Sequence, residues 1–232
     1  MNPPVRLRAA TTEETVAVFC DSFADYPVMR YVLGASPDYD ERLRELITLF
    51  VMGRVLRGDP LLAMDSDGEA VACATLTRPD STVMTGPGEA TATEELDRLA
   101  GKTWASLGEA ARGRYSTFVE AANATDVEQP HFHVNMIGVV SSHLGRGLAR
   151  PLLEEAHARS AAHPESEGVS LGTELPKNVT LYQHFGYEIV AHLQVDEGIE
   201  TWGFFRPDAS AEYGGLRMGD GVEPPPAGNS GR

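Results

Sequence analysis

Residues 137–149 combine an apolar run with a glycine-containing turn, and this combination is suited to binding a phosphate group. The turn holds Gly145 and Gly147, and an amphipathic pattern follows it. We therefore expect a strand that leads into a helix over residues 145–162. Such a helix start points unpaired backbone N–H groups and the positive end of the helix dipole at one place. Glycine also lets a phosphate approach the backbone closely.

Three other interpretations apply to this turn. The helix can simply begin with glycines that bind nothing. A dinucleotide-binding turn has a third glycine where this chain has Arg150, and it normally lies in the first strand–helix unit, whereas this turn lies past the middle of the chain. A Walker-type phosphate loop needs a Gly-Lys-Ser/Thr sequence, which the turn lacks.

A second pattern, in residues 176–187, supports the phosphate-binding interpretation. Asn178, Tyr182 and Gly186 recur at four-residue steps, so Asn178 and Tyr182 share one face of a short helix. Together the two patterns resemble the GNAT superfamily of acetyl-CoA-dependent N-acetyltransferases, and most of all the puromycin N-acetyltransferase type. The resemblance extends over residues 5–206 and is carried by residues 5–7, 23–27, 41–50, 138–139, 145–148, Asn178, Tyr182, 197–198 and 201–202.

The resemblance implies direct transfer of an acetyl group from acetyl-CoA to an amine through a tetrahedral intermediate. Backbone N–H groups at Gly138 and Val139 are expected to polarise the thioester carbonyl. Tyr182 is expected to protonate the leaving thiolate, and the alternative is that it only packs its helix against the sheet. The motif positions expected to contact acetyl-CoA are Ile137, Gly138, Val139, Leu144, Gly145, Arg146, Gly147, Leu148, Ala149, Asn178 and Tyr182.

The chain departs from the family pattern at two positions. Leu144 stands where the first motif position usually has Gln or Arg, which is compatible with phosphate contacts made mainly by the backbone. Gly172 stands where puromycin-type enzymes have a glutamate. Glu174 follows two residues later, so strand alternation directs it to the same side from a different place. The role of the family glutamate therefore does not transfer directly to this chain.

His133 is the candidate base. His131 and His133 point to one face of the strand that leads to the acetyl site. This stretch is similar to the His-x-His of arylalkylamine N-acetyltransferases, with His133 at the first position and Asn135 at the second. An imidazole that titrates near neutrality can deprotonate an amine through water; a hydrogen-bonded core histidine is the alternative.

The same His-x-His also suggests a zinc site. Two histidines on one face can bind zinc, but the sequence shows no HExxH motif, no cysteine pair and no well-spaced third ligand. Cys20 and Cys73 are expected to be small core residues. We therefore expect no metal.

The acceptor amine is expected to bind between the first two helices, where the superfamily builds its acceptor wall. Asp25 is suited to an ammonium group and the aromatic residues to a substrate ring; a turn with ordinary packing is the alternative. Inserted helices that carry Trp104 and Tyr115 are expected to cover the same site. The candidate acceptor-binding residues are Phe23, Asp25, Tyr26 and Tyr31.

Strand and helix patterns alternate along the chain and predict an α/β protein. The resemblance narrows this to a GNAT fold: a mixed central sheet of about seven strands flanked by helices, with a helical insertion at about 80–128 between the third and fourth strands. Leu43, Leu46, Ile47, Phe50 and Val55 have the spacing of one buried helix face. The domain is expected to span residues 1–206, and a flexible Gly- and Pro-rich tail to span 207–232. Strands are expected at residues 5–10, 61–64, 69–77, 132–140, 169–175, 187–195 and 201–205, and further helices at 11–24, after 36–37 and at 178–185.

The composition excludes several classes of protein. The 232 residues carry a formal net charge of −15, which disfavours nucleic-acid binding. No apolar run approaches the roughly 20 residues that a membrane-spanning helix needs, and no secretory signal is visible. Only two cysteines are present, so we expect a cytoplasmic protein without a disulfide framework.

The expected function is transfer of acetyl from acetyl-CoA to a primary amine of a small molecule, including antibiotic-like amines. The alternatives are acetylation of a protein amine and a non-catalytic acyl-CoA-binding module. The negative net charge favours a cationic acceptor. We expect a monomer or a homodimer.

Overall fold

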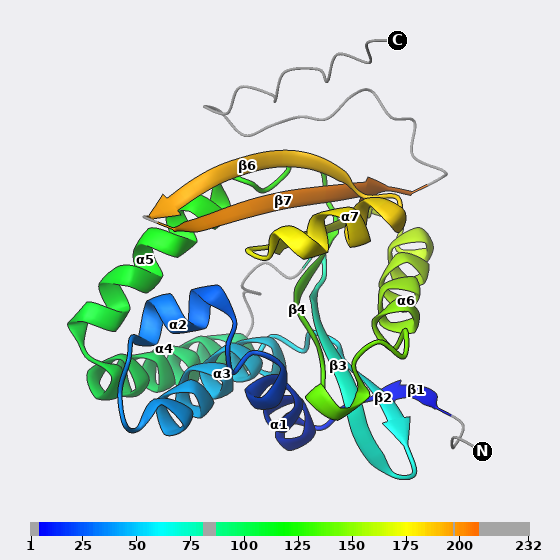
Figure 1. The fold of residues 1–232 in the computed structure, drawn as a ribbon. Coiled ribbons are helices and arrows are strands. Elements are labelled where there is room, and N and C mark those ends of the chain that lie inside the picture. Colours follow the sequence, from blue (N-terminus) through cyan, green and yellow to red (C-terminus); the bar gives the residue numbers. More distant parts are fainter. Residues whose placement is uncertain (1–4, 81–86, 197, 209–232) are drawn as a thin grey trace.

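Seven strands form one mixed sheet in the computed structural model, which describes residues 5–80, 87–196 and 198–208 (Figure 1). The strand order is β1-β2-β3-β4-β5-β7-β6. Neighbouring strands are antiparallel except β4 and β5, which are parallel. The mixed sheet expected from the sequence is therefore confirmed. The strands are β1 (Arg6–Ala9), β2 (Leu61–Ser66), β3 (Glu69–Thr77), β4 (Phe132–Val139), β5 (Gly168–Thr173), β6 (Glu188–Asp196) and β7 (Ile199–Pro207).

Helices cover both faces of the sheet. Helices α1 and α3 pack on one face of β3 and β4, and α6 packs on the other (Figure 1). Helices α4 and α5 form the helical insertion expected between the third and fourth strands. The tail expected at 207–232 lies outside the described residues from position 209 onward. The helices are α1 (Thr12–Ser22), α2 (Pro27–Leu33), α3 (Tyr39–Val55), α4 (Pro87–Leu107), α5 (Glu109–Asn123), α6 (Ala149–Ala162) and α7 (Pro176–His184), with one 3₁₀ turn at Ser141–His143.

Helix α2 was not expected from the sequence. Pro27 was interpreted only as the end of the preceding helix, but it occupies the first turn of α2. Proline is favourable there, because the N–H group it lacks would have no partner within the helix. The segment expected to be a simple turn between two helices is thus helical from residue 27 to residue 33.

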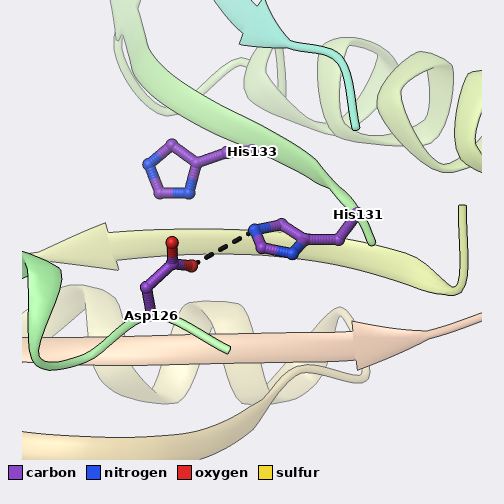
Figure 2. A group of neighbouring side chains, drawn as sticks. All are labelled: Asp126, His131 and His133. Carbon is purple, nitrogen blue, oxygen red and sulfur yellow. Dashed lines mark ion pairs between the residues drawn. The ribbon is translucent and has the colours of Figure 1, made fainter. Parts of the chain in front are cut away.

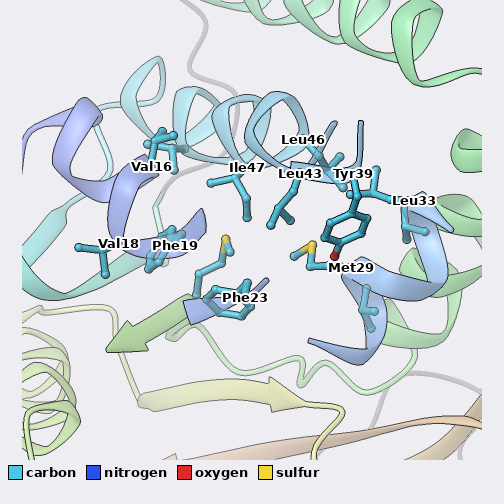
Figure 3. Packing of buried hydrophobic residues seen from close by; sticks show 14 of the residues in the cluster. Val16, Val18, Phe19, Phe23, Met29, Leu33, Tyr39, Leu43, Leu46 and Ile47 are labelled. Atoms are coloured by element: carbon cyan, nitrogen blue, oxygen red, sulfur yellow. The ribbon is translucent and has the colours of Figure 1, made fainter. Parts of the chain in front are cut away.

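The sheet separates two apolar clusters. One lies between the sheet and helices α1, α2 and α3, and includes Phe19, Leu43 and Ile47 (Figure 3). Leu43, Leu46 and Ile47 are at most 2% exposed, which confirms the helix face expected from their spacing; Phe50 and Val55 lie partly buried at its edge. The other cluster lies under α6 and α7.

Strand β4 contains a bulge at Asn135. Met136 pairs with Thr75 and Val134 pairs with Leu76, so Asn135 has no opposite residue on β3. The extra residue reverses the alternation of side chains. Val134 therefore belongs to the cluster under α6, whereas Met136 belongs to the cluster under α1 and α3.

Strands β4 and β5 separate at this bulge. Their pairing is confined to Phe132–Val134 on β4 and Val169–Leu171 on β5. Beyond it β4 continues beside β3, and β5 continues beside β7. The sheet is therefore open between its two halves along the remainder of β4.

Candidate active site

A cavity of about 870 Å³ adjoins the place where β4 and β5 separate. Its walls come from α2, α3, α5, α7, β3, β4, β5 and β7, and from the loops beside them. A cavity of this size is in the usual range for a small-molecule site. The candidate residues that line it are Phe23, Tyr26, His133, Ile137, Asn178 and Tyr182.

Two of the four candidate acceptor residues lie elsewhere. The Asp25 side chain is 88% exposed and forms an ion pair with Arg30. The Tyr31 hydroxyl donates a hydrogen bond to Asp196, at 2.9 Å. The structure therefore brings only Phe23 and Tyr26 of this group to the cavity wall.

Tyr182 lies on α7 with its side chain buried at the cavity. Burial, with the nearby charge of Glu174, raises the pKa of its phenol to about 12. The hydroxyl is therefore protonated at neutral pH, and no group in the described part of the chain hydrogen-bonds to it. One turn earlier, Asn178 donates to the hydroxyl of Thr173 at 3.1 Å, which fixes the start of α7 against β5.

Glu174 is a buried carboxyl group at the same cavity. Its Oε1 accepts a hydrogen bond from the Thr201 hydroxyl at 2.8 Å, and its backbone N–H donates to the Tyr26 hydroxyl at 3.1 Å. Burial raises the pKa of Glu174 above its ordinary value. Strand alternation indicated the side on which Glu174 lies, but the partners that hold it come from α1–α2 and β7. Gly172 lines the cavity as well, and a Cβ there would meet only the Trp202 carbonyl, at 3.6 Å.

His133 faces the cavity from β4. Its Nδ1 lies 2.7 Å from the Ser170 hydroxyl on β5. Burial lowers the pKa of its imidazole to about 4, and Asp126 offsets only part of this effect. His133 is therefore uncharged at neutral pH.

Asp126 joins the two histidines on this wall (Figure 2). Its Oδ1 lies 3.2 Å from His131 Nε2, and the Nδ1 of the same ring lies 2.5 Å from the Gln129 carbonyl. Burial alone would raise the pKa of Asp126, but the hydrogen bond with His131 lowers it. No sequence pattern indicated this third group, because Asp126 lies in a loop and has no regular spacing with the histidines.

Three arginines that sequence patterns did not single out line another part of the cavity. Arg54 forms a 3.3 Å ion pair with Asp59, whose side chain is fully buried, and Arg78 lies 3.7 Å from the same carboxylate. Burial, followed by the charge of Arg57, lowers the pKa of Arg54. Arg54 and Arg78 thus share the Asp59 carboxylate, and Arg78 also lies 3.6 Å from Asp80. Arg57 lines the same part of the cavity.

The insertion contributes Tyr115 to the cavity wall. Its ring stacks on Phe50, with the centroids 5.4 Å apart, and Trp104 lies behind it at 5.0 Å. Only Tyr115 of the two expected aromatic residues therefore faces the cavity. Cys73 is buried and Cys20 is half-buried.

The open edge of β4 carries free backbone groups. The Val140 N–H donates to the Val71 carbonyl at 3.0 Å. Antiparallel alternation then directs the backbone groups of Gly138 toward β3 and those of Ile137 and Val139 toward the open side. Gly138 has a different structural role: a Cβ there would lie 2.9 Å from the Cβ of Ser22, so the glycine lets α1 pack on the strand.

The glycine turn follows β4 directly. Gly145 and Gly147 both have φ of +74°, a conformation that glycine adopts without the cost a side chain brings. Helix α6 consequently begins at Ala149, four residues later than the sequence pattern indicated. The turn is held at both ends, because Leu148 is buried and Asp21 accepts hydrogen bonds from the backbone and hydroxyl of Ser141.

The turn is exposed and separate from the cavity. Leu144 is 66% exposed, and none of residues 144–149 lines the cavity. Arg146 is exposed beside them. Most of the candidate phosphate-binding residues thus lie at the C-terminal end of β4. The catalytic candidates His133 and Tyr182 lie at the cavity, toward the other end of the strand.

No helix in the described ranges has the length and apolar character needed to cross a membrane.

Comparisons with known proteins support the fold. No protein-family model matches the sequence. The crystal structure of a histone acetyltransferase HPA2 and related acetyltransferase from Corynebacterium glutamicum superposes with a TM-score of 0.62, at 24% identity, over 91% of this chain and 99% of that chain. Arylalkylamine N-acetyltransferase 2 from Aedes aegypti superposes with a TM-score of 0.51, at 12% identity, over 87% of this chain and 97% of that chain. The chain therefore has the GNAT fold that its motifs indicated.

Proposed function

We propose that this protein transfers the acetyl group of acetyl-CoA directly to a primary amine of a small molecule. The observation that supports this most strongly is the open edge of β4. It runs between a turn that can hold a pyrophosphate and a cavity that contains the Tyr182 hydroxyl.

The turn and the open edge fit the donor in complementary ways. Gly145 and Gly147 leave space above the backbone, since a Cβ at either would meet no atom within 4 Å. The following helix directs its first N–H groups at the same place. The free N–H and carbonyl groups of Ile137 and Val139 can pair with the amide groups of an extended arm, as a neighbouring strand would.

Acetyl-CoA supplies an activated acyl carbon whose C–S bond breaks as a C–N bond to the amine forms. The N–H groups at the open edge would stabilise negative charge on the carbonyl oxygen, and Val139 is better directed for this than Gly138. Tyr182 would donate its proton to the departing sulfur. Its raised pKa keeps that proton in place until the sulfur becomes basic.

His133 is the proposed base, acting directly or through water. Its lowered pKa keeps the imidazole unprotonated at neutral pH, as a base requires. Glu174 is placed to hold the acceptor as an ammonium ion before deprotonation, because its carboxyl lies in the same cavity as Tyr182. The proton taken from the amine leaves through His133 and water, and the one lost by Tyr182 returns from solvent.

The acceptor is proposed to be small and to carry a polar group opposite its amine. A cavity walled by so many elements favours a small molecule over a polypeptide. The amine would face Glu174. The polar group at the other end would offer hydrogen-bond acceptor oxygens to the arginines Arg54, Arg57 and Arg78. Antibiotic-like amines such as puromycin belong to this class. A cytoplasmic location and a monomeric or homodimeric state complete the proposal.

An acetylation assay tests the proposal. The protein is incubated with acetyl-CoA and a panel of amines, in which each amine is paired with an analogue that carries a carboxylate substituent. Thiol release and product mass are recorded. We expect a Tyr182→Phe variant to lose about 10²-fold or more in kcat. The matched control is Tyr187→Phe, because the Tyr187 hydroxyl bonds His157 at 2.8 Å and does not line the cavity.

Different failures point to different alternatives. Binding of acetyl-CoA without acetylation of any amine would support a non-catalytic acyl-CoA-binding module. Acetylation of peptide amines alone would support a protein acetyltransferase. Equal kcat for Tyr182→Phe and Tyr187→Phe would remove Tyr182 from the chemistry.

A further inference from the structure

We propose that Asp126, His131 and His133 form a binding site for a divalent transition-metal ion of the zinc type on the cavity wall. One ring nitrogen of each histidine and one carboxylate oxygen of Asp126 lie within 4.8 Å of one another. Figure 2 shows the carboxylate of Asp126 pointing toward both rings. A metal ion placed among these atoms needs only small side-chain movements to reach bonds of about 2.0–2.2 Å.

The donor set selects the kind of ion. Two imidazoles and one carboxylate suit zinc and similar ions, whereas magnesium and calcium prefer oxygen ligands alone. All three residues line the cavity. Three protein ligands with the remaining position open to a cavity is the usual arrangement of zinc sites that also bind a water or a substrate group.

Outer contacts already orient both rings. The Nδ1 of His131 lies 2.5 Å from the Gln129 carbonyl, which leaves Nε2 directed at Asp126. The Ser170 hydroxyl lies 2.7 Å from His133 Nδ1 and fixes the second ring. Hydrogen bonds of this kind from the second ring nitrogen are characteristic of metal-binding histidines.

The backbone under the site is rigid on both sides. His133 pairs with Thr77 on β3 and with Ser170 on β5. This is the one stretch of β4 that is paired with both neighbours, just before β5 separates. The backbone at His133 is therefore fixed, whereas His131, one residue before β4, and Asp126 lie outside regular secondary structure.

The chain offers a matched control in a second histidine–carboxylate pair. His192 Nε2 lies 2.9 Å from Glu200 on strands β6 and β7. It has the same kind of ion pair as His131 and Asp126 but belongs to no group of three metal-ligating side chains in the described ranges. If metal binding requires three ligands, replacing His131 will weaken it and replacing His192 will not.

Zinc titration of the full-length protein tests the site. After treatment with a chelator and its removal, Zn²⁺ and Mg²⁺ are titrated calorimetrically, and bound metal is measured by elemental analysis after dialysis. We expect one Zn²⁺ per chain and no heat from Mg²⁺. His131→Ala and Asp126→Asn should each weaken Zn²⁺ binding at least 10-fold, and His192→Ala should leave it unchanged.

Cobalt provides a readout that a purely structural ion pair would not affect. Bound Co²⁺ should give a visible absorption band, typical of an ion coordinated with low symmetry, in the wild type and in His192→Ala. His131→Ala should lack this band. Circular dichroism establishes that each variant is folded. Absence of Zn²⁺ binding to the folded wild type, or equal binding by His131→Ala, would overturn the proposal.

A second readout rests on the proposed function. Because His133 belongs to both the metal site and the proposed catalytic group, Zn²⁺ should inhibit acetyl transfer, and a chelator should reverse this. His131→Ala should be insensitive to Zn²⁺. A protein that binds Zn²⁺ but acetylates no amine would contradict the proposed function and leave the metal site supported.

Discussion

The two ends of β4 present different kinds of chemical group. At the C-terminal end, an exposed turn offers backbone groups, and its shape depends on two glycines with positive φ. At the N-terminal end, a cavity is lined by side chains that come from eight different helices and strands. The first site is local in the sequence, whereas the second exists only after the whole chain has folded. The geometry of the backbone turn is thus determined by its local conformation, whereas the geometry of the side-chain cavity is determined by how distant segments pack together.

Replacing both glycines of the turn should have the largest effect. Alanine at positive φ costs about 1–2 kcal/mol per residue, and the exposed turn can relax to avoid this cost. The double variant Gly145→Ala/Gly147→Ala should therefore lose its N–H array and bind acetyl-CoA about 100-fold more weakly by calorimetry.

The control for this variant is Gly68→Ala. Gly68 also has positive φ, at +89°, and open space around it, but it lies in the β2–β3 turn away from both ends of β4. Its variant should bind acetyl-CoA normally. An equal loss in both variants would show that the turn acts through general stability and not through its backbone groups.

Replacing Glu174 should affect the other end of β4. Glu174→Gln keeps the shape and can still accept from Thr201, but it cannot hold an ammonium ion. We expect about a 10-fold rise in KM for the amine and an unchanged KM for acetyl-CoA. For the wild type, the amine KM should fall as pH rises through the raised pKa of Glu174, and the variant should lack this dependence.

The same substitution should increase stability. A carboxyl with a raised pKa contributes stability at low pH and loses it as pH rises through the folded value. At neutral pH the buried charge is therefore unfavourable, and Glu174→Gln should raise Tm. A lower Tm at pH 7 would show that the charged form is well stabilised by its neighbours.

His133 should show the smallest of these effects, in the pH dependence of stability. Its pKa is lowered from 6.5 to about 4, so the folded protein binds fewer protons than the unfolded chain between these values. Stability should therefore fall as pH decreases from 6.5 to 4, by a few degrees in Tm. His133→Gln should reduce this slope. Identical slopes would contradict the buried, uncharged state of His133.

The sequence predicted the features that depend on local pattern. Alternating and helical spacings identified the strands and the buried face of α3, and the motifs located the turn after β4 and the short helix that carries Tyr182. The start of α6 was wrong by four residues, because two glycines at positive φ cannot belong to a regular helix. Helix α2 was missed because a proline that ends one helix can equally begin the next.

The contents of the cavity were predicted less well. Asp126 approaches the histidines only because the loop after α5 runs beside β4. Asp25, by contrast, was placed in the site by its chemistry, yet folding directs it to solvent. Residue type and spacing carry no information about such approaches between distant segments. Strict strand alternation would also be in error here, because it assigns His133 and Ile137 to one face, whereas the bulge puts them on opposite faces.

That last error follows from the bulge at Asn135 and affects how this sequence is to be aligned with others. Removing Asn135 would leave every other residue of β4 on its present face, because Val134 and Met136 already oppose consecutive residues of β3. The extra residue is thus an insertion that the core does not require. In an alignment, odd-numbered residues before Asn135 therefore face the same side of the sheet as even-numbered residues after it.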